Sequence, residues 1–315
     1  MTDTRIDILM VGPQVPAYAD ALERTFTVHK LWLASDRQAF LDQRASVIRG
    51  IATNAPVGAD RALIEALPKL EIISSLGIGL DAIDLAAARA RQVIVTNTPG
   101  VLDDCVTDAG MMLLLAVARR LGEAERFVRA GQWLDAKFPL ATSLKGKTCG
   151  VLGMGNIGQA FAERAQAFGM RIAYSTPRPK PDLPYAHVAD PLELARQSDF
   201  LVLALPGGKQ TRHLVDAAML DALGPQGFLI NIARGSVVDE AALVAALQSQ
   251  RIAGAGLDVF EEEPCVPAAL LEMDNVVLTP HLASATHETR KAMSDLAFAN
   301  LDAHFSGKPV LTRVV

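Results

Sequence analysis

The chain has 315 residues, half of them hydrophobic, and a formal net charge of −5. This length allows two domains with buried cores, and the scattered cations of an acidic chain argue against nucleic acid as the main partner. The first five residues lack the pattern of a secretory signal, the apolar stretch 109–118 is too short to span a bilayer, and three dispersed cysteines suggest neither a disulfide framework nor a metal site. We therefore expect a cytoplasmic protein without membrane or metal binding.

The first third of the chain alternates short apolar runs with helical patterns. Strands are expected at residues 6–11, 28–33, 46–48, 72–74 and 93–96, and helices at 17–24, 36–42 and 59–67. The last of these strands runs into the breaker cluster Asn97-Thr98-Pro99-Gly100. This alternation is typical of a parallel sheet with helices on both faces.

A second series of strands and helices begins at Thr148. Strands are expected at residues 148–152, 171–174, 200–205, 228–231, 255–259 and 276–278, and a helix at 240–248 with Asp239 as its N-cap. The tail at 286–305 is helical and has no strand of its own, so we expect it to cross back to the first domain. The sequence therefore predicts an α/β fold of two doubly wound parallel-sheet domains, one from residues 1–99 and 286–315 and the other from 100–285.

A glycine motif stands between the expected strand at 148–152 and a helical pattern at 159–168. It reads Gly153-Met154-Gly155-Asn156-Ile157-Gly158. The first glycine can make a tight turn, Gly155 can let backbone approach phosphates, and Gly158 can let the helix pack close to its strand. A helix N-terminus also offers free N–H groups and a partial positive charge. These features predict a Rossmann domain that binds a dinucleotide.

The residues after the next strand indicate which dinucleotide is preferred. Sites that prefer NAD carry an Asp or Glu there, which binds the ribose 2′-hydroxyl. This chain has Ser175-Thr176-Pro177-Arg178-Pro179-Lys180 instead. Hydroxyls and cations suit a 2′-phosphate, so we predict that Ser175, Thr176 and Arg178 bind NADPH or NADP, with NAD bound more weakly. The alternative is a solvated loop with incidental charge.

Three further segments follow expected strands, at residues 231–240, 256–264 and 275–286. Ligands bind at the carboxyl ends of strands in open α/β sheets. With the glycine motif, the order and spacing of these segments resemble the D-isomer-specific 2-hydroxyacid dehydrogenases, from the loop at Leu76 to the C-terminal helix. The resemblance implies a Rossmann cofactor domain and a discontinuous, flavodoxin-like substrate domain.

Three residues in these segments suit the reduction of a 2-keto acid. Arg234 can bind the substrate carboxylate and polarise the ketone. His281 can donate the proton, because imidazole titrates near working pH, and Glu263 can pair with it, orient its ring and raise its pKa. The resemblance assigns the same roles. Each residue also has an ordinary interpretation, as a surface cation, a turn residue and one of three solvated acids.

Other positions in the segments are expected to contact the cofactor. Asp258 either binds the nicotinamide amide, as the matching family residue does, or accepts hydrogen bonds from nearby backbone. The remaining contacts implied by the resemblance are Leu205, Pro206, Ile232, Ala233, Arg234, His281 and Ser284. His29, His187, His213, His287 and His304 have no motif around them and are expected to be structural or superficial.

The loop at residues 75–81 resembles the family's substrate loop, whose backbone N–H groups reach the substrate carboxylate. Its expected substrate-binding residues, which act with Arg234 and His281, are Leu76, Gly77, Ile78 and Gly79. The alternative is a plain turn between a strand and a helix. Apolar walls at Leu76 and Ile78 would tolerate glyoxylate and hydroxypyruvate, and an aromatic 2-keto acid is a further option.

The tract at 205–213 resembles that of glyoxylate/hydroxypyruvate and hydroxyphenylpyruvate reductases. We therefore predict NADPH-dependent reduction of glyoxylate and hydroxypyruvate to 2-hydroxy acids. Reduction of hydroxyphenylpyruvate or 2-ketogluconate on the same scaffold is the alternative, and a non-catalytic dinucleotide sensor is a more distant one. In relatives the region before the glycine motif joins two subunits, so a homodimer is expected, with Trp133 and Phe138 as interface candidates.

Overall fold

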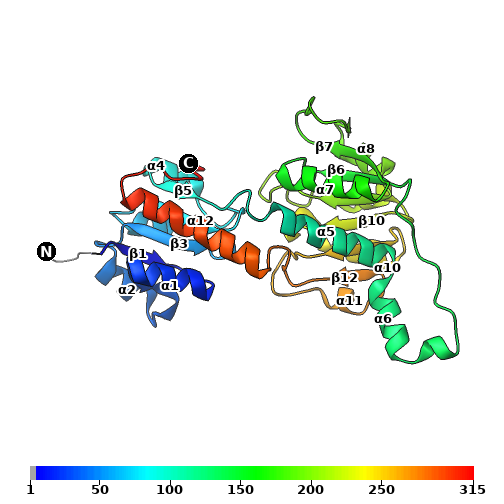
Figure 1. Ribbon diagram of the computed structural model, residues 1–315, viewed down its shortest axis with the longest axis horizontal. Coiled ribbons are helices and arrows are strands. Elements are labelled where there is room, and N and C mark those ends of the chain that lie inside the picture. The colour runs from blue at the N-terminus through cyan, green and yellow to red at the C-terminus, as the bar shows by residue number, and fades with distance from the viewer. Residues whose placement is uncertain (1–4) are drawn as a thin grey trace. The chain divides into compact units, whose positions relative to one another are not determined.

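The computed structural model describes residues 5–315, which form two compact units (Figure 1). Unit 1 runs to Leu102 and resumes at Thr286–Val315, whereas unit 2 is the continuous segment Asp103–Ala285. Each unit has a parallel sheet of its own, so the α/β class with two parallel sheets is confirmed. Within residues 5–315, no helix has both the length and the apolar character needed to cross a bilayer.

Unit 1 holds a five-stranded sheet in the order β2-β1-β3-β4-β5. Its strands are β1 (Asp7–Met10), β2 (Thr27–Lys30), β3 (Gly50–Asn54), β4 (Ile72–Leu76) and β5 (Ile94–Thr96). Its helices are α1 (Pro16–Thr25), α2 (Arg37–Arg44), α3 (Arg61–Ala66), α4 (Leu85–Ala90) and α12 (His287–Phe305), with a 3₁₀ turn at Leu31–Leu33. Helix α12 packs on this sheet beside α1 (Figure 1), and the Ser74 hydroxyl of β4 donates to the Ala297 carbonyl at 2.9 Å.

Unit 2 holds a seven-stranded sheet in the order β12-β11-β10-β9-β6-β7-β8. Its strands are β6 (Thr148–Leu152), β7 (Arg171–Ser175), β8 (Ala186–His187), β9 (Phe200–Leu203), β10 (Phe228–Asn231), β11 (Gly254–Leu257) and β12 (Val276–Leu278). Its helices are α5 (Asp103–Ala118), α6 (Leu121–Arg129), α7 (Asn156–Ala167), α8 (Pro191–Gln197), α9 (Ala217–Leu223), α10 (Glu240–Gln248) and α11 (Ala268–Leu271), with 3₁₀ turns at Gln132–Leu134 and Gly235–Val237. The strand order reverses between β6 and β9, which is where ligands bind in such sheets.

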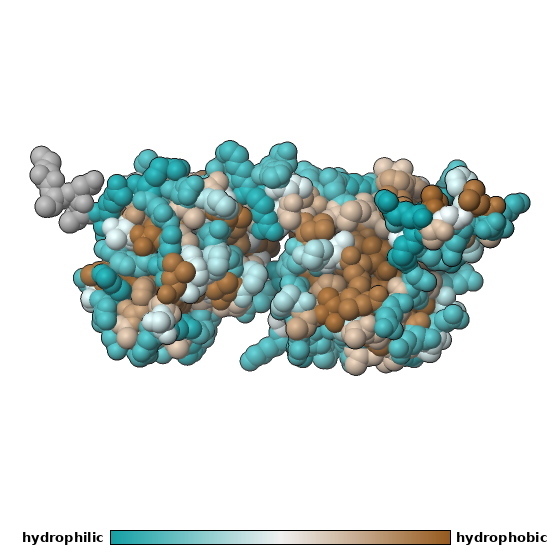
Figure 2. Space-filling model, turned by 90° about the horizontal axis from the view of Figure 1, so that it is seen from below, coloured by the Kyte–Doolittle hydropathy of each residue, from teal (hydrophilic) through white to brown (hydrophobic). Residues whose placement is uncertain are grey.

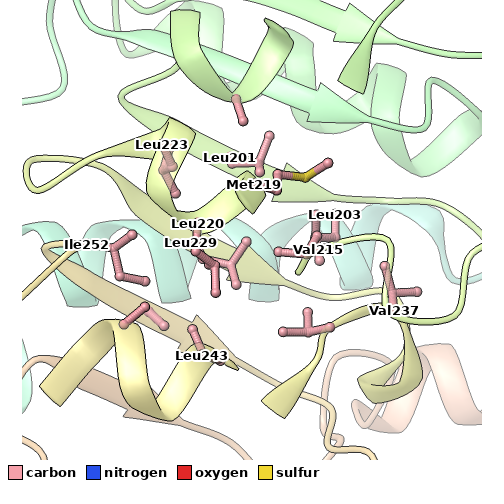
Figure 3. Packing of buried hydrophobic residues seen from close by; sticks show 14 of the residues in the cluster. Leu201, Leu203, Val215, Met219, Leu220, Leu223, Leu229, Val237, Leu243 and Ile252 are labelled. Atoms are coloured by element: carbon pink, nitrogen blue, oxygen red, sulfur yellow. The ribbon is translucent and has the colours of Figure 1, made fainter. Parts of the chain in front are cut away.

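The core of unit 2 explains why its strands are almost wholly apolar. Figure 3 shows Leu201, Leu203 and Leu229 of the central strands packed against Met219 and Leu220 of α9, all of them buried. Helices on both sheet faces bury both sides of each strand, so alternation of polar and apolar residues disappears. The packed sheet gives the loops at its carboxyl edge fixed starting points.

Several expected elements differ from the structure. The strand expected at residues 46–48 is absent, and β3 begins at Gly50 instead. A Cβ on Gly50 would lie 3.1 Å from the Ile8 and Phe305 side chains, so the close packing at this position favours glycine. Residues 31–33 form a 3₁₀ turn rather than the end of β2, and β9 and β11 stop two residues before their expected ends. The helix at 240–248 is confirmed, and the Asp239 carboxylate caps it by accepting the Ala242 N–H at 3.0 Å.

Candidate active site

The glycine motif forms a tight turn between β6 and α7. Gly153 has φ +92°, and a Cβ on it would lie 2.5 Å from the Ala204 carbonyl oxygen, so glycine is required there. A Cβ on Gly158 would lie 2.1 Å from the Gly153 carbonyl oxygen, which confirms the expected close packing of helix and strand. Gly155 is the N-cap of α7, makes no side-chain cap and has open space where a Cβ would point. The helix N-terminus is therefore accessible to an anion.

Arg234 lies on a tight loop after β10. The Asn231 side chain holds this loop by donating to the Arg234 carbonyl and accepting the Ala233 N–H, both at 3.0 Å. Gly235 follows, and a Cβ on it would lie 1.9 Å from the Phe260 carbonyl carbon. Only glycine lets the Arg234 loop touch the backbone that leads to Glu263, and no local sequence pattern indicates this requirement.

Glu263 and His281 are brought together from two different loops of unit 2. Glu263 Oε2 lies 2.7 Å from His281 Nδ1, and Oε1 accepts the Phe260 N–H at 3.1 Å. Burial tends to raise the Glu263 pKa, but the bonds from His281 and Phe260 and the nearby Arg234 charge together hold this pKa below the usual glutamate value. Glu263 is therefore a carboxylate at neutral pH and holds a proton on His281 Nδ1, so that Nε2 is the ring nitrogen that Glu263 does not engage.

The backbone of His281 is left-handed, with φ +51°. Its N–H donates to the Asp258 carbonyl at 2.8 Å, and the Asp258 carboxylate accepts from the Thr279 hydroxyl, Leu282 N–H and Ala283 N–H at 2.6–2.9 Å. Asp258 thus supports the turn that presents His281, which is the second of its two expected roles. Its contact with a nicotinamide amide stays a prediction. Left-handed backbone at a non-glycine residue often accompanies function.

The loop after β7 carries the residues expected to bind a 2′-phosphate. Ser175 is buried at the end of β7, Thr176 is half-buried and Arg178 is exposed. The Thr176 hydroxyl donates to the Arg178 carbonyl at 2.7 Å. Within residues 5–315, no carboxylate forms an ion pair with Arg178 or Lys180, unlike most other arginines of unit 2, which leaves both cations available to an anion.

The expected substrate loop belongs to unit 1. Gly77 has φ +126°, its N–H donates to the Thr98 hydroxyl at 3.0 Å, and the Asn97 amide donates to the Ile78 carbonyl at 3.0 Å. Leu76 is buried as the last residue of β4, whereas Ile78 and Gly79 are half-buried. Hydrogen bonds from and to residues 97 and 98 thus fix this turn, and the Gly77 N–H is bonded to Thr98.

A network beside Glu263 was not predicted from the sequence. The Glu261 carboxylate accepts a hydrogen bond from Arg212 at 2.6 Å and lies 2.8 Å from His213 Nε2. The backbone N–H of Glu261 donates to the Glu240 carboxylate at 2.8 Å. Burial, followed by repulsion from the three glutamates at 261–263, raises the Glu240 pKa, although the Glu261 N–H opposes this. His213 therefore joins the loop after β9 to the segment that carries Glu263. In the sequence, the one sign of this network is the carboxylate of Glu240 at the start of α10.

The remaining expected cofactor residues occupy the same edge of the unit 2 sheet. Ile232 and Ala233 are buried after β10, Leu205 and Ser284 are half-buried, and Pro206 is exposed. The glycine turn and the segments of Arg234, Glu263 and His281 all follow carboxyl ends of strands in this sheet. A carboxylate-held histidine moves protons, and a dinucleotide domain handles hydride. Fold and site thus define the class of dinucleotide-dependent oxidoreductases.

Comparison with known proteins identifies the family. A model of the D-isomer specific 2-hydroxyacid dehydrogenase NAD-binding domain matches residues 111–283. The glyoxylate/hydroxypyruvate reductase A of Arabidopsis thaliana is 47% identical over 310 residues, covering 98% of this chain and 99% of that protein. The hydroxyphenylpyruvate reductase of Plectranthus scutellarioides is 48% identical over 310 residues, with the same coverage.

A solved structure agrees over the full length. The NADPH-dependent glyoxylate/hydroxypyruvate reductase of Sinorhizobium meliloti, in complex with NADP and malonate, is 44% identical with a TM-score of 0.91, covering 99% of this chain and 97% of that one. The chain therefore belongs to the D-isomer-specific 2-hydroxyacid dehydrogenase family, and the resemblance stated from the sequence is confirmed.

Proposed function

We propose that this enzyme uses NADPH to reduce small 2-keto acids, with glyoxylate and hydroxypyruvate as its preferred substrates, to 2-hydroxy acids. The observation that carries the proposal is the pairing of His281 Nδ1 with Glu263 at 2.7 Å beside Arg234. The names of the Arabidopsis and Sinorhizobium relatives support the substrate class and the cofactor.

The residues of unit 2 fit a bound NADPH. Open space over Gly155 and the uncapped start of α7 suit the pyrophosphate. Ser175, Thr176 and Arg178 would hold the 2′-phosphate, and no carboxylate stands between Ser175 and Lys180 to repel it. When bound, the cofactor supplies the hydride. Asp258, Ile232, Ala233, Leu205, Pro206 and Ser284 are the proposed remaining contacts.

The chain's own residues supply binding and the proton. Arg234 would hold the substrate carboxylate and polarise its ketone, because a guanidinium fork matches two oxygens. In unit 1, Leu76, Gly77, Ile78 and Gly79 stay the predicted substrate-binding loop. Glu263 fixes a proton on His281 Nδ1, so that protonated Nε2 can donate to the ketone oxygen and become neutral.

Initial rates of NADPH and NADH oxidation test this proposal. The panel is glyoxylate, hydroxypyruvate, pyruvate, 4-hydroxyphenylpyruvate and 2-ketogluconate. Fast NADPH-dependent turnover of the first two is expected. Binding of NADPH without turnover of any keto acid would contradict the proposal and favour a dinucleotide sensor.

Two relatives favour a second candidate with the same chemistry. They are the hydroxyphenylpyruvate reductase described above and the 2-ketogluconate reductase of Gluconobacter oxydans, 45% identical over 309 residues. The same rate panel separates the candidates. A higher kcat/KM for the aromatic or the sugar acid would replace the proposed substrates and leave the roles of Arg234, Glu263 and His281 unchanged.

The proposal includes a cytoplasmic homodimer that joins through the arm at residues 121–140. Trp133, Leu134 and Leu140 are 70%, 91% and 96% exposed, although such side chains are usually covered. Figure 2 shows hydrophobic side chains gathered over the unit that bears this arm. Phe138 instead packs on Phe127 and under the Arg120 guanidinium, which gives the arm its shape. Sedimentation of the wild type and of Trp133→Asp tests the dimer, since the charged variant should sediment as a monomer.

A further inference from the structure

The loop Thr176–Lys180 is hydrogen-bonded at both ends to aromatic side chains of the neighbouring strands β7 and β8. Tyr174 of β7 is 1% exposed, and its hydroxyl accepts the Lys180 N–H at 2.8 Å while donating to the Lys180 carbonyl at 3.3 Å. This one hydroxyl therefore satisfies both backbone groups of the residue that ends the loop. It closes a loop of seven residues, from Tyr174 to Lys180, around Arg178.

The start of the loop is fixed by His187 of β8. Its Nε2 lies 3.0 Å from the Thr176 carbonyl oxygen, to which it donates, and its ring packs on Tyr174 with centroids 5.1 Å apart. Residues Tyr174 and His187 are direct partners in the pairing of β7 with β8. The short strand β8 thus carries the second support of the loop.

Within the loop, little freedom remains for the backbone of Arg178. Pro177 and Pro179 flank it and restrict their own φ angles, and the Thr176 hydroxyl holds its carbonyl at 2.7 Å. The Arg178 side chain is exposed, and no carboxylate of residues 5–315 pairs with it. The backbone is therefore set before an anion arrives, while the cation stays available.

We propose that Tyr174 and His187 are positioning residues for cofactor selection, because they hold Thr176–Lys180 in the shape that presents Arg178 to a 2′-phosphate. This inference rests on the proposed NADPH dependence. Preorganisation lowers the entropy lost when the anion binds. NADH has no 2′-phosphate and gains nothing from the loop, so the two residues raise affinity for NADPH alone.

Dissociation constants of NADPH and NADH for Tyr174→Phe test the proposal. The variant keeps the buried ring and loses only the hydroxyl that binds Lys180. Binding of NADPH should weaken by about 5-fold, the worth of one net hydrogen bond, with NADH binding and kcat at saturating NADPH unchanged. Tyr185→Phe is the matched control, because it removes an exposed hydroxyl from the same region and should change neither constant.

Histidine 187 is tested by its conservative variant. His187→Ala should weaken NADPH binding about as much as Tyr174→Phe, and His187→Gln should restore it, because the glutamine amide can reach the Thr176 carbonyl as Nε2 does. A purely structural role would weaken NADPH and NADH binding equally, or give no rescue by glutamine. Either result overturns the inference.

Arg178→Ala separates this inference from the proposed function. If Arg178→Ala leaves the ratio of the two dissociation constants unchanged, the 2′-phosphate assignment itself is wrong. If Arg178→Ala weakens NADPH binding and Tyr174→Phe does not, only the role of Tyr174 is wrong. In the double variant, the effect of Tyr174→Phe should disappear, because it acts through Arg178.

Discussion

Two histidine–glutamate pairs of similar length occupy opposite kinds of position in this molecule. His281 and Glu263 lie 2.7 Å apart on loops after strands of unit 2, and His304 and Glu71 lie 3.0 Å apart in unit 1. Glu71 immediately precedes β4, and His304 is near the end of α12. The first pair thus stands at a carboxyl edge of a sheet, where ligands bind, and the second at an amino edge.

Their surroundings differ as much as their positions. Glu71 also binds the Arg49 guanidinium, which stacks over the Phe305 ring, and His304 is 18% exposed and packs on the same ring. His281 is 40% exposed, and within residues 5–315 no hydrogen bond to its Nε2 is seen. We therefore expect that a histidine–glutamate pair alone does not act as a general acid, and that an open second nitrogen at a ligand-binding edge is also required.

The largest expected effect is that of His281→Asn. Asparagine tolerates the left-handed backbone of this position but cannot donate a proton, so kcat should fall by about 10²–10⁴-fold. NADPH binding should remain. Stopped-flow reduction of the preferred keto acid measures the rate, and near-normal turnover would remove His281 from the acid role.

A smaller loss of kcat is expected for Glu263→Gln, which keeps His281 but removes the carboxylate charge beside its Nδ1. The neutral amide no longer stabilises the imidazolium, and kcat should fall by about 10- to 100-fold. Steady-state rates at neutral pH measure the loss, and an unchanged kcat would show that Glu263 does not act on His281.

The second pair should affect stability and leave turnover unchanged. Burial opposes ionisation of Glu71, but its bonds to Arg49 and His304 together hold the pKa below the usual glutamate value. Such a carboxyl stabilises the fold above its unfolded pKa, and this contribution disappears as the pH falls toward the folded pKa. Glu71→Gln should therefore cost about 1 kcal/mol at neutral pH and less at about pH 3, below the usual glutamate pKa. Urea unfolding at both pH values measures it, and an equal cost at both would contradict the charge-based account.

The smallest effect is expected for His304→Gln, since Arg49 still binds Glu71. Unfolding free energy should change by no more than about 0.5 kcal/mol, and kcat should not change. Thermal denaturation and the standard rate assay check both. A loss of turnover here would erase the distinction between the two pairs.

Short apolar runs separated by helical patterns predicted most strands of both sheets, because a parallel strand buried on both faces consists almost wholly of apolar residues. The strand expected at residues 46–48 was placed too early, because β3 begins at Gly50, where crowding by Ile8 and Phe305 selects glycine. Such contacts join residues distant in sequence and leave no local pattern. The two-residue strand β8 was missed for its length, and with it the support that His187 gives.

The motifs at strand ends could be found because each has a local signature. The glycine turn, Arg234, Glu263 and His281 follow apolar runs in a recognisable order. The supports of these residues could not be found in the same way. Gly235 is required by the backbone of Phe260, and Asp258 by three donors on another loop. The roles of the site residues themselves stay predictions until the variants are measured.

The discontinuity of unit 1 has a consequence for synthesis on the ribosome. The two segments of unit 1 are joined by hydrogen bonds. Val314 donates its N–H to the Val95 carbonyl at 2.8 Å, and the Thr312 hydroxyl donates to the Asn97 carbonyl at 2.6 Å. Unit 2 is one continuous stretch, so all of it is synthesised before residues 286–315. The strands of unit 1 are synthesised before unit 2, but α12, which packs on β4 and α1, is synthesised after it, so unit 1 can be completed only after unit 2 has been made.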